Sequence, residues 1–408
     1  MHHEGALKVL VDKLTVQGID VEQVKNKLKN QKIELPSWGF SDSGTRFQIF
    51  KQPGVPRNIY EKFDDAAYIH KLTGIAPSVA IHIPWDKTDD WAKLKAYVDD
   101  LGLKIGAVNP NLFQEQEYKL GGFSNEDPHI RKKALDHHFE CIDIMNITGS
   151  KYLSLWYPDG TSFPGQGSFI RRKHYFEENL AQTYEKLASD QFLLLEYKCF
   201  EPAFYHTDIP DWGTSYLLCL KLGERAQVLV DLGHHLLGTN IEHIVAILID
   251  ENRLGGFHFN NKKYADDDLT VGSINPYELY LIYVELVNAE KHFGESFRPA
   301  YMVDQCHNLK PKHEAMLQTL MTLQTAYAKA LIVDRKSLEE AQRTGNVLEA
   351  ERIIVKAFNT DVEPLLQQIR IEMGLHPDPI QAHRESGYFE KVVEARKDPL
   401  PSQSTGWV

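Results

Sequence analysis

Eight short apolar runs recur along the chain, and most are followed by a longer segment whose hydrophobic positions have helical spacing. The helix-like segments are residues 64–72, 91–100, 127–146, 171–188, 214–222, 241–249 and 276–292. The apolar runs are residues 35–40, 79–84, 104–109, 152–156, 192–196, 228–231, 256–260 and 301–304. A strand and a helix repeated eight times are typical of a closed parallel barrel. The alternative, an open doubly wound sheet, is disfavoured because no G-x-G-x-x-G opens a helix and no phosphate-binding loop is present. The pattern therefore predicts an α/β protein with a (β/α)₈ TIM barrel.

The segments on either side of the predicted barrel are helical. Residues 1–34 have the hydrophobic pattern of one or two amphipathic helices, with Val21, Val24 and Leu28 at helical spacing. Residues 311–333 and 346–373 are long and helix-rich, and Gly345 and Gly374 are expected to interrupt them. We therefore expect an N-terminal helical segment (1–34), a catalytic barrel (35–330) and a C-terminal helical arm (331–408) that contributes to oligomer contacts.

Composition limits the class of partner. The 408 residues include 57 Asp+Glu against 45 Lys+Arg, giving a net charge of −12. This balance disfavours nucleic-acid binding, which requires clustered cations. The N-terminus has no signal-peptide pattern, and no apolar stretch approaches the ~20 residues of a membrane span. The four cysteines form no C-x-x-C pair, so we expect reduced thiols and a cytoplasmic protein without membrane or nucleic-acid partners.

Acidic and histidine residues follow four successive apolar runs, at the positions where catalytic groups gather in a barrel. Read singly, each has an ordinary explanation, such as a strand-end salt bridge, a helix cap or a solvated loop. Read together, they predict a site for two divalent ions. Carboxylates with imidazoles and no thiolate favour Mn²⁺, with Co²⁺ or Mg²⁺ as alternatives, over structural zinc. The seven candidate ligands are Glu196, Asp231, His234, His258, Asp266, Asp268 and Asp304.

Two neighbours of these candidates are set aside. His235 lies next to His234 and is an alternative ligand. Asp267 would point away from the ion if Asp266 and Asp268 chelate one ion from an extended loop. Lys198 follows Glu196 by two positions, so both side chains should face the barrel mouth.

Aromatic residues at other strand ends predict a small sugar as the substrate. His82 and Trp85 lie in His-Ile-Pro-Trp-Asp, Trp156 ends the fourth run, and Trp38 and Phe40 end the first. Apolar rings pack against the C–H faces of sugars, while a few polar groups fix the orientation of the ligand.

Long motifs resemble bacterial L-rhamnose isomerase, in its broad-specificity branch, over about residues 35–330. They are Ser37-Trp-Gly-Phe-Ser-Asp-Ser-Gly-Thr-Arg-Phe, His82-Ile-Pro-Trp-Asp, Leu195-Glu-Tyr-Lys, Glu201-Pro-Ala-Phe-Tyr-His, Asp231-Leu-Gly-His-His and Tyr264-Ala-Asp-Asp-Asp-Leu. That family is similar to xylose isomerase, and the resemblance implies a homotetrameric barrel with two Mn²⁺-type ions.

The resemblance also implies roles for individual residues. One ion would be held by Glu196, Asp231, His258 and Asp304. The other would be held by Glu196, His234, Asp266 and Asp268, with Glu196 bridging the two. The implied catalytic residues are Lys198, His82 and Asp304, and the implied substrate-binding residues are Trp85, Trp156 and Phe47, with Phe47 or Phe50 reaching a neighbouring subunit.

We therefore expect conversion of L-rhamnose to L-rhamnulose by a metal-assisted hydride shift, because most carboxylates are committed to ions and no base is free over C2. The alternatives are a sugar epimerase on the same barrel, a metal-dependent phosphodiesterase and a non-catalytic sugar-binding protein. The sequence does not rank L-rhamnose against L-lyxose, L-mannose or D-allose.

Overall fold

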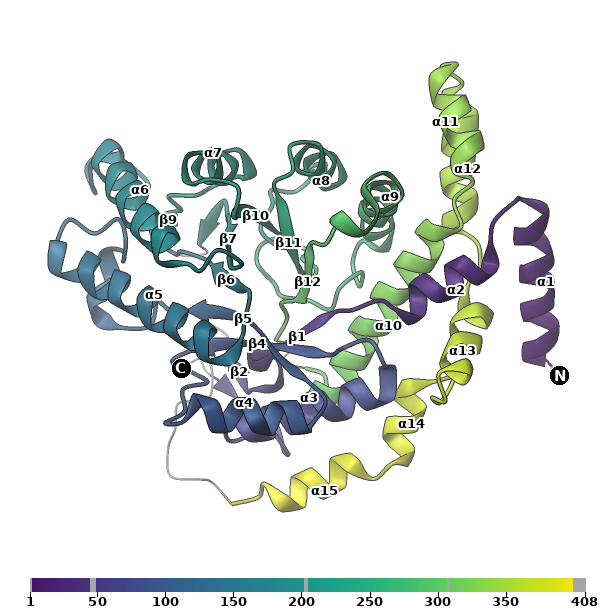
Figure 1. The fold of residues 1–408 in the computed structure, drawn as a ribbon, viewed down its shortest axis with the longest axis horizontal. Helices are drawn as coiled ribbons and strands as arrows, with labels where there is room; N and C mark the ends of the chain where they lie inside the picture. Colours follow the sequence, from purple (N-terminus) through teal and green to yellow (C-terminus); the bar gives the residue numbers. More distant parts are fainter. Residues whose placement is uncertain (1, 45–48, 202–204, 307–308, 399–408) are drawn as a thin grey trace.

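The computed structural model describes residues 2–44, 49–201, 205–306 and 309–398. Its centre is a closed barrel of parallel strands in the order β1-β12-β11-β10-β7-β6-β5-β4 (Figure 1). Each predicted apolar run contributes one strand, so the predicted (β/α)₈ fold is confirmed. The strands are β1 (Glu34–Pro36), β4 (Ser78–Ile83), β5 (Lys104–Pro110), β6 (Tyr152–Leu155), β7 (Phe192–Glu196), β10 (Ala226–Asp231), β11 (Leu254–Phe259) and β12 (Ala300–Val303).

Capping residues start each helix that follows a barrel strand from β1 to β11. An Asn, Asp or Ser immediately before each helix accepts a backbone N–H from its first turn, which satisfies a donor that the helix itself leaves unpaired. The helices are α3 (Ile59–Thr73), α4 (Trp91–Asp100), α5 (Pro128–Thr148), α6 (Phe169–Lys186), α7 (Trp212–Leu222), α8 (Ile241–Asp250) and α9 (Pro276–Phe293).

Alternation along the strands decides which side chains enter the barrel. A cluster of buried residues inside the barrel contains Ala80, Ala107, Leu194, Leu229 and Met302. Successive strand residues point to opposite faces, so the residue two positions further along the same strand also points inward. The positions that follow Ala80, Leu194, Leu229 and Met302 in this way are His82, Glu196, Asp231 and Asp304.

The floor of the barrel contains a half-buried carboxylate. Glu34 accepts hydrogen bonds from the Ala107 backbone N–H at 2.8 Å and the Ser78 hydroxyl at 2.7 Å. A Cβ at Gly106 would lie 1.7 Å from Glu34 Oε2, so this close approach requires glycine.

The first predicted run was too long. Only Glu34–Pro36 is strand, and Ser37–Phe40 forms the 3₁₀ turn η1. Proline at the end of the strand lacks the N–H needed to extend the ladder. The turn is packed closely, because a Cβ at Gly39 would lie 2.7 Å from the Gln305 carbonyl oxygen.

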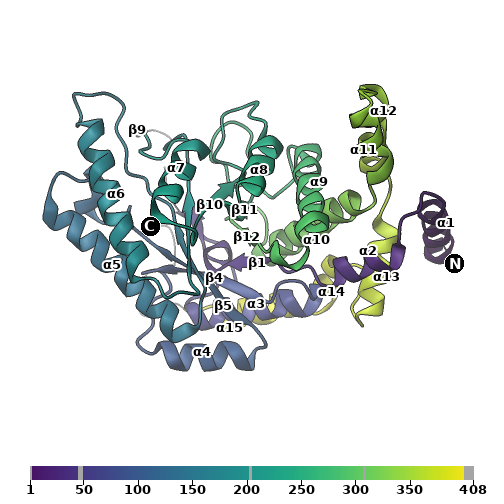
Figure 2. The same ribbon diagram turned by 45° about the horizontal axis from the view of Figure 1, so that its top comes forward.

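Helices outside the barrel form a layer beside α3 and α9, and one pair projects away from it. At the N-terminus, the chain forms two helices, α1 (His2–Val16) and α2 (Val21–Lys29). After α10 (Lys312–Leu331), the pair α11 (Arg335–Arg343) and α12 (Val347–Phe358) projects away from the barrel (Figures 1 and 2).

The chain then returns to the barrel. Helix α13 (Glu363–Glu372) packs against α1 and α2, and α14 (Pro379–Glu385) packs against α3 and α10, followed by α15 (Tyr388–Ala395). Gly345 and Gly374 adopt positive φ at the expected interruptions. Residues 359–362 additionally divide the predicted long helix into α12 and α13.

The cysteines and the apolarity of the helices bear on two further expectations. Cys141, Cys199, Cys219 and Cys306 form no disulfide with one another; Cys141 and Cys219 are buried, and the other two are half-buried. None of the helices in the described ranges combines the length and apolarity needed to cross a bilayer.

Candidate metal centre

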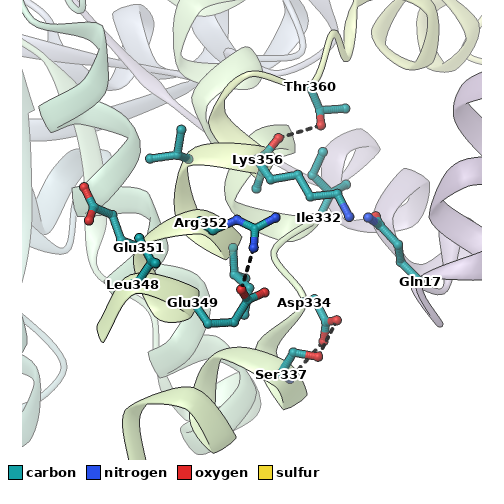
Figure 3. A pocket seen from close by; sticks show the side chains of 13 residues that line it. Gln17, Ile332, Asp334, Ser337, Leu348, Glu349, Glu351, Arg352, Lys356 and Thr360 are labelled. Carbon is teal, nitrogen blue, oxygen red and sulfur yellow. Dashed lines mark hydrogen bonds and ion pairs between the residues drawn. The ribbon is translucent and has the colours of Figure 1, made fainter. Parts of the chain in front are cut away.

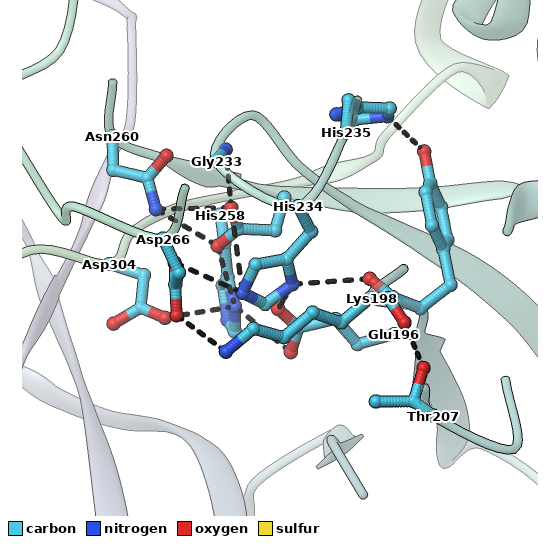
Figure 4. A network of polar contacts seen from close by, with 12 residues as sticks. Glu196, Lys198, Thr207, Gly233, His234, His235, His258, Asn260, Asp266 and Asp304 are labelled. Atoms are coloured by element: carbon cyan, nitrogen blue, oxygen red, sulfur yellow. Dashed lines mark hydrogen bonds and ion pairs between the residues drawn. The ribbon is translucent and has the colours of Figure 1, made fainter. Parts of the chain in front are cut away.

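Four strands bring one group of ligand atoms together at the barrel mouth (Figure 4). One atom each from Glu196, Asp231, His258 and Asp304 lies within 4.8 Å of the others. His258 Nδ1 is 3.3 Å from Glu196 Oε2, 3.5 Å from Asp304 Oδ2 and 3.9 Å from Asp231 Oδ2. These are the four residues expected to share one ion.

The two ring nitrogens of His234 meet different carboxylates of the centre. Its Nδ1 lies 3.1 Å from both the Tyr197 carbonyl oxygen and Glu196 Oε1. Its Nε2 lies 3.3 Å from Asp266 Oδ1 and 4.0 Å from Asp231 Oδ1. A second group of converging ligand atoms therefore consists of Asp231, His234 and Asp266.

Asp231 is the residue common to the two groups. The resemblance implied that Glu196 bridges the ions, and the geometry differs on this point. Glu196 lies at the Nδ1 side of the His234 ring, opposite the Nε2 atom that meets Asp266. Glu196 therefore contributes to the first group only, and Asp231 is the residue that contributes to both.

The loop after β11 separates three consecutive acids. Asp266 turns into the centre, whereas Asp267 is exposed and accepts the backbone N–H groups of Lys263 and Tyr264. Asp267 N also bonds Ala265 O at 2.9 Å, and Asp268 has a φ of 45°. The loop is thus a tight turn and not the extended segment expected, so Asp268 belongs to neither group of converging atoms.

Asp268 nevertheless lies beside the centre. Its Oδ1 is 3.4 Å from Asn260 Nδ2, and the same amide donates to both oxygens of Asp231 at 3.1 and 3.0 Å. His235, the alternative to His234, points away and contacts the Tyr197 hydroxyl at 2.6 Å.

Crowding of like charges shifts the titration of the cluster. Burial raises the pKa of Asp231, Asp268 and Asp304, and neighbouring carboxylates raise it further. Burial acts in the same direction on Glu196, but His258 and His234 outweigh it and lower the pKa of that carboxyl. Burial would lower the pKa of both histidines, and the surrounding carboxylates raise it instead.

These residues fit a pair of divalent cations. Glu196 Oε1, His258 Nδ1 and Asp266 Oδ1 are buried atoms that no hydrogen bond satisfies among the described residues. Buried polar atoms ordinarily find a partner, and buried carboxylates in contact ordinarily require a counter-charge. Oxygen and imidazole ligands without thiolate suit Mn²⁺, Co²⁺ or Mg²⁺.

Lys198 borders the second group. Its ammonium donates to Asp266 Oδ2 at 2.6 Å and to Glu201 Oε2 at 2.7 Å, and it lies 4.9 Å from the centre of the Trp156 ring. Burial would lower the pKa of Lys198, but the two carboxylates outweigh it and raise it, so the side chain remains a cation. Sequence reasoning overlooked Glu201 as its partner, although it lies three positions along the chain.

The aromatic candidates form the opposite side of the mouth. His82 stacks on Trp85 with ring centres 4.0 Å apart, and Trp38 meets His82 edge-on at 5.5 Å. Phe113, which sequence reasoning missed, contacts Trp85 edge-on at 5.9 Å and Trp156 at 5.1 Å. It follows β5 by three residues, and no pattern in the sequence marked it as facing the mouth.

Two polar atoms on this aromatic side have no hydrogen-bond partner among the described residues. They are His82 Nδ1 and Trp156 Nε1. Such atoms suit a ligand that carries hydroxyl groups. Phe47, the remaining substrate-binding candidate, lies outside the described residues; Phe50 is in β3 (Ile49–Phe50).

Trp38 also reaches the metal centre. Its indole N–H donates to Asp304 Oδ1 at 2.7 Å, which leaves Oδ2 to face His258. Groups that orient ligands in this way tune metal sites. Sequence reasoning had assigned Trp38 only as an aromatic surface.

The chain is similar to known sugar-converting proteins. It is 45% identical to a probable sugar isomerase of Rhizobium meliloti, covering 95% of this chain and 91% of that protein. It is 25% identical to xylose isomerase of Thermus thermophilus, covering 58% and 65%. A solved D-allulose 3-epimerase of Methylomonas sp. covers 73% of this chain and 98% of its own at 13% identity, with a TM-score of 0.52, which shows a common fold. No family model matches the chain.

Proposed function

The chain belongs to the xylose-isomerase-like family of sugar isomerases, and on that premise we propose that it is a metal-dependent aldose–ketose isomerase that converts L-rhamnose to L-rhamnulose. Related aldoses, namely L-lyxose, L-mannose and D-allose, are further candidate substrates. The observation that carries the proposal is the pair of ligand groups that share Asp231 at the barrel mouth.

Isomerisation moves one hydrogen between C1 and C2 and another between O1 and O2. Two divalent ions, Mn²⁺ in our proposal, supply Lewis acidity to the sugar oxygens. Glu196, His258 and Asp304 would hold one ion, His234 and Asp266 the other, and Asp231 both. We also propose Asp268 as a ligand, although in this structure it lies beside the centre and joins neither group.

Lys198 is proposed to stabilise negative charge on a substrate oxygen. Its two carboxylate contacts fix the ammonium beside Asp266, where it need not reorient during the reaction. Because Lys198 remains a cation, it acts through its charge and hydrogen bonds and not as a base.

The aromatic side is proposed to hold the carbon skeleton of the sugar. The rings of Trp85 and Trp156 offer apolar faces, and the free ring nitrogen of His82 offers one site for a proton. Burial is the main cause that lowers the pKa of His82 well below the ordinary value, and the positive charge of Lys62 acts in the same direction. A neutral imidazole at neutral pH suits a role in opening the sugar ring.

Direct transfer of hydrogen from C2 to C1 remains our proposed route, since six of the seven candidate residues converge in the two ligand groups. One observation favours a second candidate, a sugar epimerase. Asp268 is outside both groups, so a carboxylate is available as a base near the centre.

One experiment tests the function and the route together. Chelator-treated protein is incubated in D₂O with each of the four sugars and one added divalent ion, and the products are followed by NMR. We expect ketose from L-rhamnose only after a metal is added, with Mn²⁺ or Co²⁺ more effective than Zn²⁺. C1 and C2 should stay free of deuterium.

Other outcomes would contradict the proposed isomerase, favour the epimerase or overturn the proposed route. Full activity in thoroughly demetallated protein, or no ketose from any sugar with any ion, contradicts the proposed isomerase. An epimer in place of the ketose supports the second candidate. Early deuterium on carbon overturns the direct transfer and leaves the isomerase assignment intact. The Asp231→Asn variant, prepared identically, controls for a contaminating isomerase.

A further inference from the structure

A buried ion pair lies behind the aromatic side of the site and is not explained by metal binding. Lys62 of α3 and Asp86, which follows β4, approach to 2.7 Å, and both side chains are 0% exposed. Desolvation of two charges is costly, and an apolar pair would often be at least as stable. The presence of such a pair therefore calls for an explanation beyond stability.

The Asp86 carboxylate connects three segments of the chain. Its Oδ1 accepts from Lys62, and its Oδ2 accepts from the His82 backbone N–H at 2.7 Å and from the Ser37 hydroxyl. In return, the Asp86 N–H donates to the His82 carbonyl at 2.9 Å. The turn from His82 to Asp86 is thus closed by hydrogen bonds in both directions, and it is fixed to α3 and to η1.

Each of the joined segments carries part of the site. The β4 turn carries His82 and Trp85, whose rings are stacked. Ser37 begins η1, and the next residue, Trp38, donates to Asp304. A short path therefore runs from the aromatic side through Asp86 and Ser37 to a carboxylate of the metal centre.

Resting on the proposed function, we infer that Asp86 is a positioning residue: it joins the end of β4 to η1 and so holds His82 and Trp85 at a fixed distance from Asp304. A sugar that must contact the rings and the ions at once requires that distance to be constant, because small misplacements of reacting groups cost large factors in rate. The buried charge pair supplies one well-defined arrangement, since any displacement leaves a charge or a hydrogen bond unsatisfied.

The test uses a small substitution and a matched control. Ser37→Ala removes the link between Asp86 and η1 but keeps the ion pair and all metal ligands. Ser150→Ala is the control, because Ser150 is also buried and its hydroxyl also donates one hydrogen bond, in its case to the Gly106 backbone carbonyl in β5, away from Asp86. The measurements are kcat and KM for L-rhamnose, the Mn²⁺ dissociation constant by calorimetry, and the thermal midpoint.

We expect both variants to lower the thermal midpoint by a similar amount. Only Ser37→Ala should lower kcat/KM, by about tenfold, and weaken Mn²⁺ binding, because groups that orient metal ligands have effects of roughly 10–100-fold. Equal kcat/KM and equal Mn²⁺ affinity in the two variants would overturn the inference.

A second variant examines Asp86 itself. Asp86→Asn alone would leave Lys62 as an unpaired buried cation, so Lys62→Met is combined with it to remove both charges. We expect this double variant to fold and to lose kcat/KM at least as strongly as Ser37→Ala. A double variant with unchanged kcat/KM would contradict the positioning role.

Calorimetry separates this inference from the proposed function. If the wild-type protein converts no sugar, the isomerase proposal fails, but Mn²⁺ affinity still compares Ser37→Ala with Ser150→Ala. A difference in affinity then supports the link to Asp304, and identical affinities refute it.

Discussion

At the residue scale, the candidate ligand atoms converge at the ends of neighbouring strands, and Asp231 contributes to both groups. Strand alternation puts Glu196 and Asp231 in the barrel mouth, and this much follows from the period of two. Which residue is common to both groups depends on the His234 ring, whose Nδ1 contacts Tyr197 O and so turns Nε2 toward Asp266. Because a backbone carbonyl sets the orientation of the His234 ring, the sequence pattern does not predict it.

The shared position of Asp231 predicts an order among ligand substitutions. Asp231→Asn should lose both ions, Glu196→Gln should lose the ion of its own group, and Asp267→Asn should keep both, because Asp267 only caps its own loop. We expect the affected sites to weaken by more than ~100-fold, beyond the usual effect of outer groups. Metal content after dialysis, measured by mass spectrometry, checks the order.

The reverse result has a definite meaning. If Glu196→Gln loses both ions and Asp231→Asn loses only one, then Glu196, and not Asp231, is the carboxylate that bridges the two ions. Asp267→Asn removes one negative charge, as the other two substitutions do, but from an exposed side chain, so loss of metal there would contradict the placement of Asp267 outside both groups.

At the scale of elements, the strands and barrel helices were predictable, and the connections with special geometry were not. Pro36 ends β1 early, and η1 then turns Trp38 toward Asp304. The Asp266–Asp268 segment similarly folds into a tight turn, so alternate acids no longer share a face. Both departures come from single-residue backbone constraints and tertiary contacts, which override a repeating pattern.

The C-terminal helices are fastened to α3 by one buried carboxylate. Asp65 accepts the Tyr388 hydroxyl at 2.7 Å, the Arg396 guanidinium at 2.8 and 2.9 Å, and lies 3.1 Å from His313 Nε2. Asp65→Asn removes the fully buried partner of Arg396 and leaves it only the partly buried Glu61 carboxylate at 3.3 Å, so we expect a loss of about 3 kcal/mol in the free energy of unfolding, the lower end for a broken buried pair. Urea unfolding measures it.

Glu394→Gln serves as the control for that substitution, because its pair with Lys397 is exposed on α15 and such pairs contribute about 0–1 kcal/mol. The effect of Asp65→Asn should also depend on pH. Burial would raise the pKa of Asp65, but His313 and Arg396 outweigh it and hold it below the ordinary 3.8. The unfolded chain then binds the proton more readily, so this contribution is complete above about pH 4 and declines as the pH falls further. A difference between wild type and variant that grows in acid would contradict the assignment.

At the scale of the whole molecule, the repeat of strand and helix was sufficient to predict the barrel, because closure follows from local periodicity. The surrounding helices were predicted individually, but their arrangement was not. Helix α13 packs against α1 and α2, and these contacts join segments more than 300 residues apart in the chain. The pair α11 and α12 is left projecting. Helical spacing marks an apolar face without indicating which neighbour will cover it.

The projecting pair carries large exposed apolar side chains, as does the end of α1. Val347 and Leu348 at the start of α12 are 74% and 69% exposed, and Val16 at the end of α1 is 88% exposed. A cavity of about 640 Å³ lies between α12 and Gln17 (Figure 3), and a larger one of about 1230 Å³ lies between α1, α9 and α11. Neighbouring exposed apolar side chains such as Val347 and Leu348 commonly mark protein–protein contacts when they form part of a larger apolar patch.

We therefore predict a homotetramer in which this projecting pair is buried between subunits. Sedimentation velocity at micromolar concentration should show a species of four chains. Val347→Ser combined with Leu348→Ser should shift it to smaller species, since two large aliphatic side chains contribute about 1.5–3 kcal/mol each and each 1.4 kcal/mol changes the dissociation constant about tenfold. Leu120→Ser with Ile170→Ser, at sites of similar exposure on the barrel's helical side, should leave the species unchanged. A wild-type monomer would refute the assembly. A tetramer that survives loss of Val347 and Leu348 but dissociates in the Leu120 and Ile170 variant would place the contact on the barrel, with α11 and α12 free for another purpose.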